Sequence, residues 1–521
     1  MKSLISTLSL LLGSTASLLA QSLPDRYRSD IATAVTVTPG VVFSTNIPQV
    51  STTNLAGVRF ANEQTYGNVR VTLKMDIYQP QGDTLSKRPV IIFCFGGGFV
   101  GGSRDAADMV ALAQSFAKRG YVTASIDYRL GMNLSDPEKA KRAVYRALQD
   151  GRAAVRFFRN NARTYGVDPN QVYISGHSAG AFVACNNAYV DQESERPAST
   201  FGVNGLADLG TLDGIGDNQT DTAGNPVSGK ANAVLSFAGA LGSVNDIEGP
   251  NDVPVALFHS VNDPIVPYYQ GQPFSFLNFV PGINLPVVYG GDPINARANA
   301  VGAPHALYTY YLRGHDVHYN RLTLPAYLYS DIVPQGSGFL YDFRLKPGAA
   351  ILTGPATVCA STLAQTYSIG AGFGYCDWQV AGGTITARDA ATNSVTVAWS
   401  ETAVIRRLTA TPYSRQLARG AAVGLTVNLT DCPTLLTNAN AFSTYPNPTS
   451  GTLQVQLTES LTGPATIRLL DKLGTVRTST ELPDASAAST QTLDLSALPA
   501  GVYYVQLTTA QKVITQRVQK E

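Results

Sequence analysis

One short segment, residues 172–184, combines a strand, a glycine-flanked turn and a helix. Residues 172–174 are β-branched or aromatic, and residues 179–184 are small or apolar. Between them, Gly176, Ser178 and Gly180 form a G-x-S-x-G pattern. Glycines at these two positions let a strand and a helix approach closely around the serine. The segment therefore predicts a nucleophile elbow, a sharp turn that presents the Ser178 hydroxyl at the end of a strand.

A serine hydroxyl is a poor nucleophile at neutral pH, so it needs a base and a carboxylate that orients the base. The chain has only five histidines, and His315 follows the last expected strand. His318, three residues further on, is the alternative base. Asp263 follows another buried strand in a turn fixed by proline. The chain order Ser178, Asp263, His315 predicts a catalytic triad.

The tetrahedral intermediate of such a reaction needs preorganised N–H donors for its negative oxygen. Three successive glycines, residues 96–98, directly follow the apolar run 89–95. Because glycine has no side chain, such a loop can turn its N–H groups toward a ligand. Gly97 and Gly98 are the predicted donors of the oxyanion hole, with the N–H of Ala179 as a third. This chemistry requires no metal and no cofactor.

Residues 30–330 alternate between strand and helix patterns, which predicts an α/β fold with a mostly parallel sheet and helices on both faces. Residues 30–85 alternate in polarity and predict antiparallel strands. A capping-box pattern at residues 135–138 predicts the start of a long helix. Strands are expected at residues 69–78, 89–95, 121–127, 172–174, 233–237, 253–258 and 307–312, of which 89–95 and 121–127 are expected to be buried, and a helix is expected at 106–118. Two long connections, 200–230 and 270–300, are expected to cover the active site and to form a pocket wall.

Beyond residue 345 the helical periodicity ends and short alternating strands rich in Thr and Val take over. Residues 375–380 and 394–399 are examples, and regular turn signals between such strands indicate a β-sandwich. A polar linker is expected at 433–444, followed by a second β-rich module to the end of the chain.

Composition limits the partners and the compartment. The net charge is +1, from 38 basic and 37 acidic residues, which argues against nucleic acid as a partner. Residues 1–20 have the pattern of a secretory signal peptide, and no later apolar run is long enough to span a bilayer. The five cysteines show no zinc-binding spacing. Export permits a disulfide, for which Cys359–Cys432 is the expected pair.

These motifs resemble the α/β-hydrolase superfamily, in particular secreted carboxylesterases and lipase-like enzymes. The resemblance covers residues 30–330 and is carried by residues 95–99, 127–130, 176–180, 314–315 and the Asp263 turn. It implies the doubly wound α/β-hydrolase fold. The family usually has a histidine before the three glycines, where this chain has Phe95. That histidine braces the loop, so the oxyanion hole is expected to survive the change. By the same resemblance, Asp127 and Arg129 are expected to be structural.

The C-terminal modules carry two further resemblances. Residues 351–430 look like a PKD-like sandwich. Residues 445–521, which open with Tyr-Pro-Asn-Pro-Thr-Ser-Gly and contain Gly-Val-Tyr-Tyr-Val, resemble a type IX secretion sorting domain of Gram-negative bacteria. That resemblance implies the secretion machinery as a partner and a secreted or surface-attached product. The expected parts are a signal peptide (1–20), a hydrolase domain (21–345), a PKD-like sandwich (346–432), a linker (433–444) and a sorting domain (445–521).

The sequence therefore predicts a secreted serine carboxylic ester hydrolase that forms an acyl-enzyme. Two alternatives remain open at this stage. One is a serine peptidase on the same fold, and the other is a non-catalytic surface-binding protein with a hydrolase scaffold. The ester itself is not specified by the sequence, because the pocket depends on the two long connections.

Overall fold

The computed structural model forms two compact units. It describes residues 25–214, 216–277, 279–280, 282–319, 327–360, 362–430, 441–458, 463–483, 489–510 and 513–521. The first unit comprises the described residues up to 350 together with 372–377 and 411–422, and the second comprises the others. The expected signal peptide and most of the expected linker lie outside the described residues.

An eight-stranded sheet forms the centre of the first unit. β1 and β4 pair antiparallel, as do β4 and β6, and the five remaining pairings are parallel. This confirms the predicted mostly parallel sheet with antiparallel strands at its N-terminal edge. In spatial order the strands are β1 (Val35–Gln49), β4 (Val69–Pro80), β6 (Val122–Ile126), β5 (Arg88–Cys94), β7 (Val167–His177), β8 (Val234–Phe237), β9 (Val255–Ser260) and β12 (His305–Tyr310).

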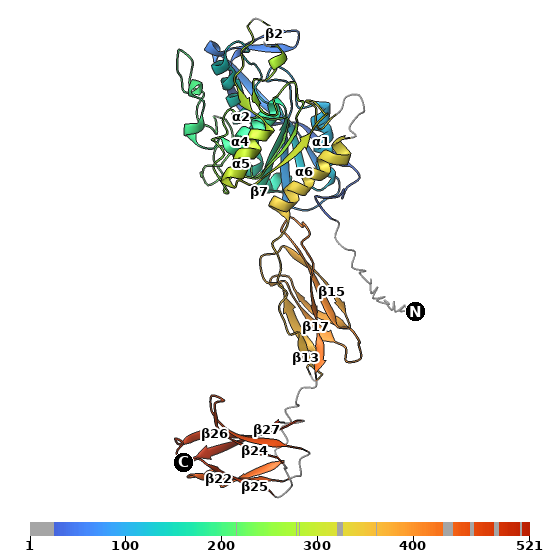
Figure 1. The fold of residues 1–521 in the computed structure, drawn as a ribbon, viewed down its shortest axis with the longest axis vertical. Coiled ribbons are helices and arrows are strands. Elements are labelled where there is room, and N and C mark those ends of the chain that lie inside the picture. The colour runs from blue at the N-terminus through green and yellow to red at the C-terminus, as the bar shows by residue number, and fades with distance from the viewer. Residues whose placement is uncertain are drawn as a thin grey trace, which may run out of the picture. The chain divides into compact units, whose positions relative to one another are not determined.

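Helices cover both faces of this sheet (Figure 1). α2 (Pro137–Asn160) and α4 (Ala179–Tyr189) pack against each other on one face, whereas α1 (Ala107–Lys118) and α6 (Val333–Leu340) pack together on the other. α5 (Gly291–Val301) connects β9 and β12. The predicted start of α2 is confirmed, because the Asp136 side chain accepts hydrogen bonds from the backbone N–H groups of Glu138 and Lys139.

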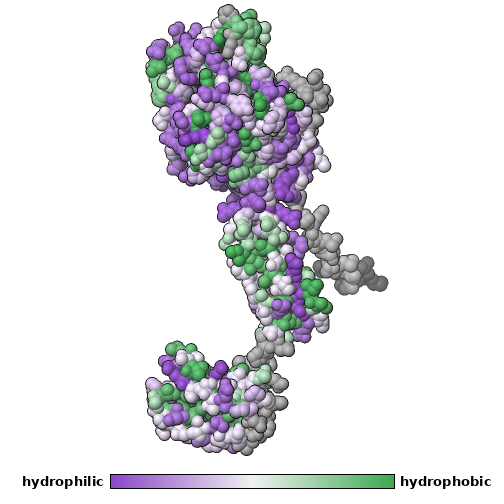
Figure 2. Space-filling view, in the orientation of Figure 1, coloured by the Kyte–Doolittle hydropathy of each residue, from purple (hydrophilic) through white to green (hydrophobic). Residues whose placement is uncertain are grey.

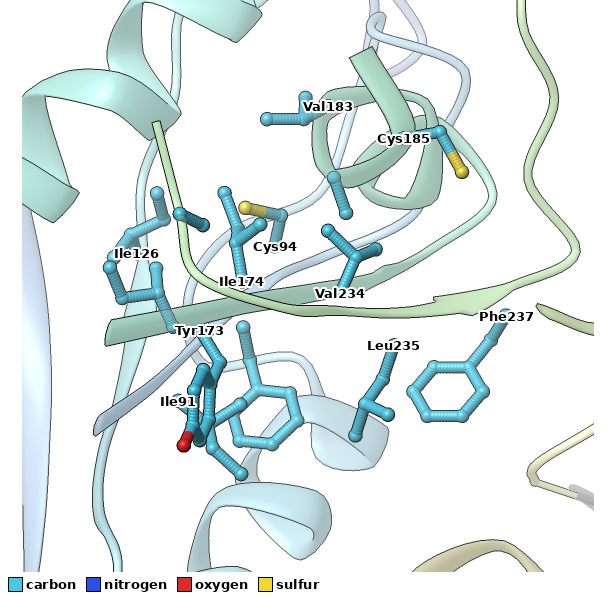
Figure 3. Close-up of a cluster of buried hydrophobic side chains, with 14 of the residues drawn as sticks. Ile91, Cys94, Ile126, Tyr173, Ile174, Val183, Cys185, Val234, Leu235 and Phe237 are labelled. Carbon is cyan, nitrogen blue, oxygen red and sulfur yellow. The ribbon is translucent and has the colours of Figure 1, made fainter. Parts of the chain in front are cut away.

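The strands at the centre of the sheet bury side chains on both faces. Figure 3 shows Ile174 and Val234 on the side of α4, near Val183, whereas Tyr173 and Leu235 point to the opposite side. All four of these strand residues are fully buried. Successive strand residues point to opposite faces, so a strand covered on both faces must be apolar throughout. This is why continuous apolar runs correctly predicted these strands.

Buried ion pairs connect the segment after β6 to α2. Arg129 donates to both carboxylate oxygens of Asp150, at 2.9 and 3.0 Å, and both side chains are 2% exposed. Asp127 instead pairs with Arg104 at 2.7 Å. Both residues thus have the structural role expected from the sequence. Removing Arg129 would leave the Asp150 carboxylate buried without a partner, which would destabilise the fold.

Beyond residue 350, the residues that the structure describes form β-strands and no helices. One part has the sheets β14–β17–β16 (Ala364–Ser368, Ser394–Trp399, Gly383–Asp389) and β15–β18–β19 (Tyr375–Ala381, Arg407–Tyr413, Val423–Thr426). The strands predicted at 375–380 and 394–399 are confirmed, and Trp378 and Trp399 are buried. Cys359 is disulfide-bonded, whereas the buried Cys376 takes part in no disulfide. Cys432 lies outside the described residues, so the pair Cys359–Cys432 stays a prediction.

The C-terminal part of the second unit has its own apolar core. Its sheets are β21–β22–β25 (Phe442–Tyr445, Thr452–Leu457, Thr490–Asp494) and β24–β23–β26–β27 (Val476–Leu482, Ala465–Asp471, Gly501–Thr509, Val513–Lys520). Side chains from both sheets, among them Leu453, Val455, Ile467 and Val505, form one buried cluster. This is the expected second β-rich module.

The surface of the first unit is largely hydrophilic in the view of Figure 2, with apolar residues scattered over it. Among the described helices, none has the length and apolar character needed to cross a bilayer. Scattered exposed apolar residues are normal for a globular protein.

The close approach of strand and helix around Ser178 gives the first prediction. A Cβ atom added to Gly180 would lie 2.0 Å from the backbone oxygen of Cys94 on β5. Because this neighbour is backbone, Gly180→Ala should lower the free energy of unfolding by about 3 kcal/mol or more. Urea titration followed by the helical circular dichroism signal measures this, since the helices of the described residues all lie in the first unit.

Gly338→Ala is the matched control. Gly338 also lies in a helix, but an added Cβ would meet nothing within 4 Å. Replacing a helical glycine by alanine at such a site should be neutral or gain up to about 1 kcal/mol. Equal stabilities of the two variants would contradict the tight approach at Gly180.

Candidate active site

Ser178 lies in a strained backbone turn between β7 and α4. Its φ is +52° and its ψ is −119°, a conformation that a residue with a side chain rarely adopts. The turn is held in place, because Ser178 N–H donates to the Phe237 carbonyl at 2.9 Å, and its own carbonyl accepts from Ala181 and Phe182. The strand–turn–helix setting predicted for the G-x-S-x-G pattern is therefore present.

Asp263 and His315, which are 52 residues apart in the sequence, meet at the ends of neighbouring strands. Nδ1 of His315 lies 2.8 Å from Oδ2 of Asp263. The Asp263 side chain is fully buried, and its Oδ1 accepts hydrogen bonds from the N–H groups of Ile265 and Val266. We assign the proton to Nδ1 of His315, which leaves Nε2 as the basic atom.

A second imidazole, His259, contacts the same carboxylate and was not anticipated from the sequence. Its Nδ1 accepts from Gly291 N–H at 3.2 Å, so its Nε2 carries the proton. That Nε2 lies 3.1 Å from the Val266 carbonyl and 3.3 Å from Oδ2 of Asp263. Burial would raise the pKa of Asp263, but the hydrogen bonds from His259 and His315 outweigh burial and hold the pKa well below its usual range. Asp263 therefore stays ionised.

His177 contacts the segment that carries His315. It precedes Ser178 directly, and its Nε2 lies 3.2 Å from the carbonyl oxygen of His315. The ring centroids of His177 and His315 are 4.7 Å apart. These contacts place His315 beside the turn that carries Ser178. The alternative base, His318, is fully buried and its Nε2 lies 3.0 Å from Asp108, so the geometry favours His315.

The predicted oxyanion donors lie around the same turn. Gly97 and Gly98 have φ values of +123° and +59°, which favour glycine. A Cβ on Gly97 would lie 2.4 Å from the Gly101 carbonyl oxygen. Ala179 is the first residue of α4, where helix N–H groups have no intrahelical acceptor. In the described part of the chain, the N–H groups of Gly97, Gly98 and Ala179 have no hydrogen-bond partner.

Phe95 stabilises this loop by packing, in the position where a histidine was expected from the family resemblance. Its ring stacks on Tyr128 with centroids 4.2 Å apart, and Tyr128 donates its hydroxyl proton to the Phe95 carbonyl at 2.7 Å. A side chain on Gly102 would collide with the Phe95 ring at 2.5 Å. The loop is thus held by an aromatic stack instead of a histidine.

Ser178, Gly98 and Ala179 line a cavity of about 250 Å³. Its wall is mostly apolar and includes Phe99, Val144, Leu148, Phe182, Phe274, Leu285 and Val288. Three charged residues, Lys141, Glu195 and Asp246, line it as well. Burial, together with the charge of Glu195, raises the pKa of Asp246 to about 6. The cavity therefore gains negative charge as the pH rises through that value.

The two long connections differ in their relation to this cavity. Residues 273–274 and 285–288 contribute to its wall, as predicted. The expectation that residues 200–230 cover the active site is wrong, because this segment packs on α2 instead. Side chains of α2 bind its carbonyl groups: Arg142 binds Ala207 at 2.8 Å, and Gln149 binds Leu209 at 2.9 Å. Residues from the segment 190–197 line the cavity instead, namely Val190, Glu195 and Pro197.

Two segments of the chain match known protein families. Residues 75–276 match the family BD-FAE, and residues 443–521 match the family described as Secretion system C-terminal sorting domain. The chain thus carries an α/β-hydrolase domain of an esterase family and a type IX sorting domain. The sorting domain indicates type IX secretion, so the protein is secreted or attached to the cell surface.

Individual relatives match over shorter stretches. The chain is 36% identical to the neuroligin-like protein glit-1 of Caenorhabditis elegans over 115 residues, which are 21% of this chain and 15% of that protein. It is 36% identical to fumonisin B1 esterase of Sphingopyxis macrogoltabida over 118 residues, 21% of each chain. The chain thus spans about a fifth of the length of these curated relatives.

Among solved structures, an esterase of Thermogutta terrifontis with bound propionate is similar, with a TM-score of 0.38 and 22% identity. The similarity covers 53% of this chain and 90% of that one.

The two histidines of the loop give the second prediction. His315→Ala should lower kcat for an ester about 1,000-fold or more, because Ser178 and its base act as one unit. His318→Gln should lower it less than about 10-fold, since the amide keeps a donor for Asp108. Steady-state kinetics of both purified variants with p-nitrophenyl esters measure this. The reverse ranking would assign the base to His318.

Proposed function

We propose that the protein is a secreted serine carboxylic ester hydrolase. The observation that carries this proposal is the 2.8 Å contact between His315 and buried Asp263 beside the strained turn of Ser178. The match to an esterase family supports it. Because one relative, the neuroligin-like protein, is not named as an esterase, similarity alone does not decide between an enzyme and a binding protein.

In the proposed reaction, Oγ of Ser178 attacks the ester carbonyl carbon and its proton passes to Nε2 of His315. Asp263 stabilises the resulting imidazolium, and the N–H groups of Gly97, Gly98 and Ala179 bind the negative oxygen. The intermediate then collapses, the C–O bond breaks, and the alcohol leaves with the proton from His315. A water molecule, deprotonated by His315, attacks the acyl-enzyme and releases the carboxylic acid and free Ser178.

The cavity suggests which part of an ester it accommodates. Its aliphatic and aromatic wall favours an apolar substituent, because burying apolar surface is worth about 25 cal/mol per Å². We propose esters with an apolar acyl or alcohol group that fits a cavity of about 250 Å³.

We also propose the domain limits inferred from the sequence, with a hydrolase domain at 21–345, a PKD-like sandwich at 346–432 and a sorting domain at 445–521. The family match of residues 443–521 supports the last of these. The proposed partner of the sorting domain is the type IX secretion machinery. In this proposal the sorting domain takes no part in the chemistry.

The third prediction tests the nucleophile. Ser178→Ala should lower kcat about 1,000-fold or more and leave the fold intact, because only the attacking oxygen is lost. Ester hydrolysis by the purified protein, with circular dichroism as a check on folding, measures this.

Ser175→Ala is the matched control for this variant. Ser175 lies on the same strand three residues earlier, and its hydroxyl is buried without a hydrogen-bond partner among the described residues. Its removal should leave kcat within about 3-fold of the wild type, since no interaction is lost. Similar turnover by both variants would end the serine hydrolase proposal.

A further inference from the structure

A cluster of three side chains adjoins the elbow and takes no part in the proposed reaction. It consists of Asp108 in the first turn of α1, His177 before the nucleophile, and His318 after the base. One potential ligand atom from each residue lies within 4.8 Å of the other two. The side chains of His177 and His318 are 9% and 1% exposed, and that of Asp108 is 19% exposed.

The hydrogen bond between His318 and Asp108 explains why these two side chains lie together, but it does not involve His177. Nε2 of His318 lies 3.0 Å from Oδ2 of Asp108. Nδ1 of His177 lies 3.9 Å from the same oxygen, which is too long for a hydrogen bond.

The neighbours of the His177 ring indicate which of its two nitrogens carries the proton. Nε2 has two nearby acceptors, the His315 carbonyl at 3.2 Å and Oδ1 of Asp316 at 3.6 Å. We therefore assign the proton to Nε2 from these distances. The lone pair of Nδ1 then faces a carboxylate oxygen with no proton between them.

Two electron-pair donors that face each other in a buried place favour a cation between them. We propose that Asp108, His177 and His318 form a binding site for a divalent transition-metal cation of the zinc type. The ligand atoms are Oδ2 of Asp108, Nδ1 of His177 and Nε2 of His318. Two imidazoles and one carboxylate match the preference of zinc and its neighbours, whereas Mg²⁺ and Ca²⁺ prefer oxygen ligands.

The distances fit such a cation after a small adjustment. Metal–ligand bonds of roughly 2.1 Å in a tetrahedral site place ligand atoms about 3.4 Å apart. The observed separations of 3.0 and 3.9 Å lie on either side of that value. The exposed edge of Asp108 gives access, and water can fill the remaining coordination position.

The hydrogen bonds around the cluster also suit a metal site. Metal-bound histidines commonly donate their other N–H to a carbonyl group, and Nε2 of His177 already lies near the His315 carbonyl. For His318, the cation replaces the proton shared with Asp108, and this proton moves to Nδ1. Because that Nδ1 has no hydrogen-bond partner among the described residues, we expect a dissociation constant on the order of micromolar.

Equilibrium binding to the full chain tests this proposal without any turnover. The protein is treated with a chelator, dialysed, and titrated with ZnCl₂ or CoCl₂, with bound metal and the temperature of unfolding as readouts. We expect one equivalent of Zn²⁺, a higher unfolding temperature, and no effect of MgCl₂. Because no ester is used, the outcome is independent of the proposed hydrolase activity.

Two variants locate the site. His318→Gln keeps a hydrogen-bond donor for Asp108 but removes the imidazole ligand, and should weaken binding at least about 10-fold. His305→Gln is the control, because His305 bonds to Ala303 and Asn295 away from the cluster, and should bind like the wild type. If His318→Gln fails to fold, Asp108→Asn takes its place with the same expected loss. No Zn²⁺ or Co²⁺ bound by the wild type, or unchanged binding by the cluster variant, would overturn the proposal.

Discussion

The close backbone approach around Ser178 is the constraint on which the rest of the site depends. A Cβ on Gly176 would lie 2.3 Å from the backbone of Gly180, and one on Gly180 would lie 2.0 Å from the carbonyl oxygen of Cys94. Only glycine at both positions lets α4 begin directly over β5 and β7. The same turn fixes Ser178 in its strained conformation and places Ala179, the first residue of α4, in the wall of the cavity.

His177 links this turn to the base. Its two ring nitrogens face different neighbours, with Nε2 toward the His315 carbonyl and Nδ1 toward Asp108. A residue inside the elbow thus holds the loop of the base in place, while its other side faces the proposed metal site. The position of His315 relative to Ser178 therefore depends on packing behind the site as well as on the hydrogen bond to Asp263.

Local patterns predicted the parts of the site that depend on neighbouring residues. The apolar runs of β5, β7 and β9 and the glycines around Ser178 are visible in the sequence, because buried strands and tight turns require particular residues locally. The pairing of His259 with Asp263 and of His318 with Asp108 was not predicted, since it depends on long-range packing. α5 was also missed: it buries only Gly291, Ile294 and Ala298, too few for a clear helical pattern. The prediction that residues 200–230 cover the active site was wrong, because side chains of α2, among them Arg142 and Gln149, bind that segment.

The central claim is that Ser178 is a nucleophile activated by His315, and covalent trapping tests it most directly. A fluorophosphonate reacts with an activated serine oxygen with loss of fluoride, so the adduct marks the attacking atom. Mass spectrometry of the treated full chain should find one adduct, on the peptide that contains Ser178, with ester hydrolysis lost in proportion. An adduct on a different serine, or an unmodified Ser178 in protein that the reagent has inactivated, would contradict this account.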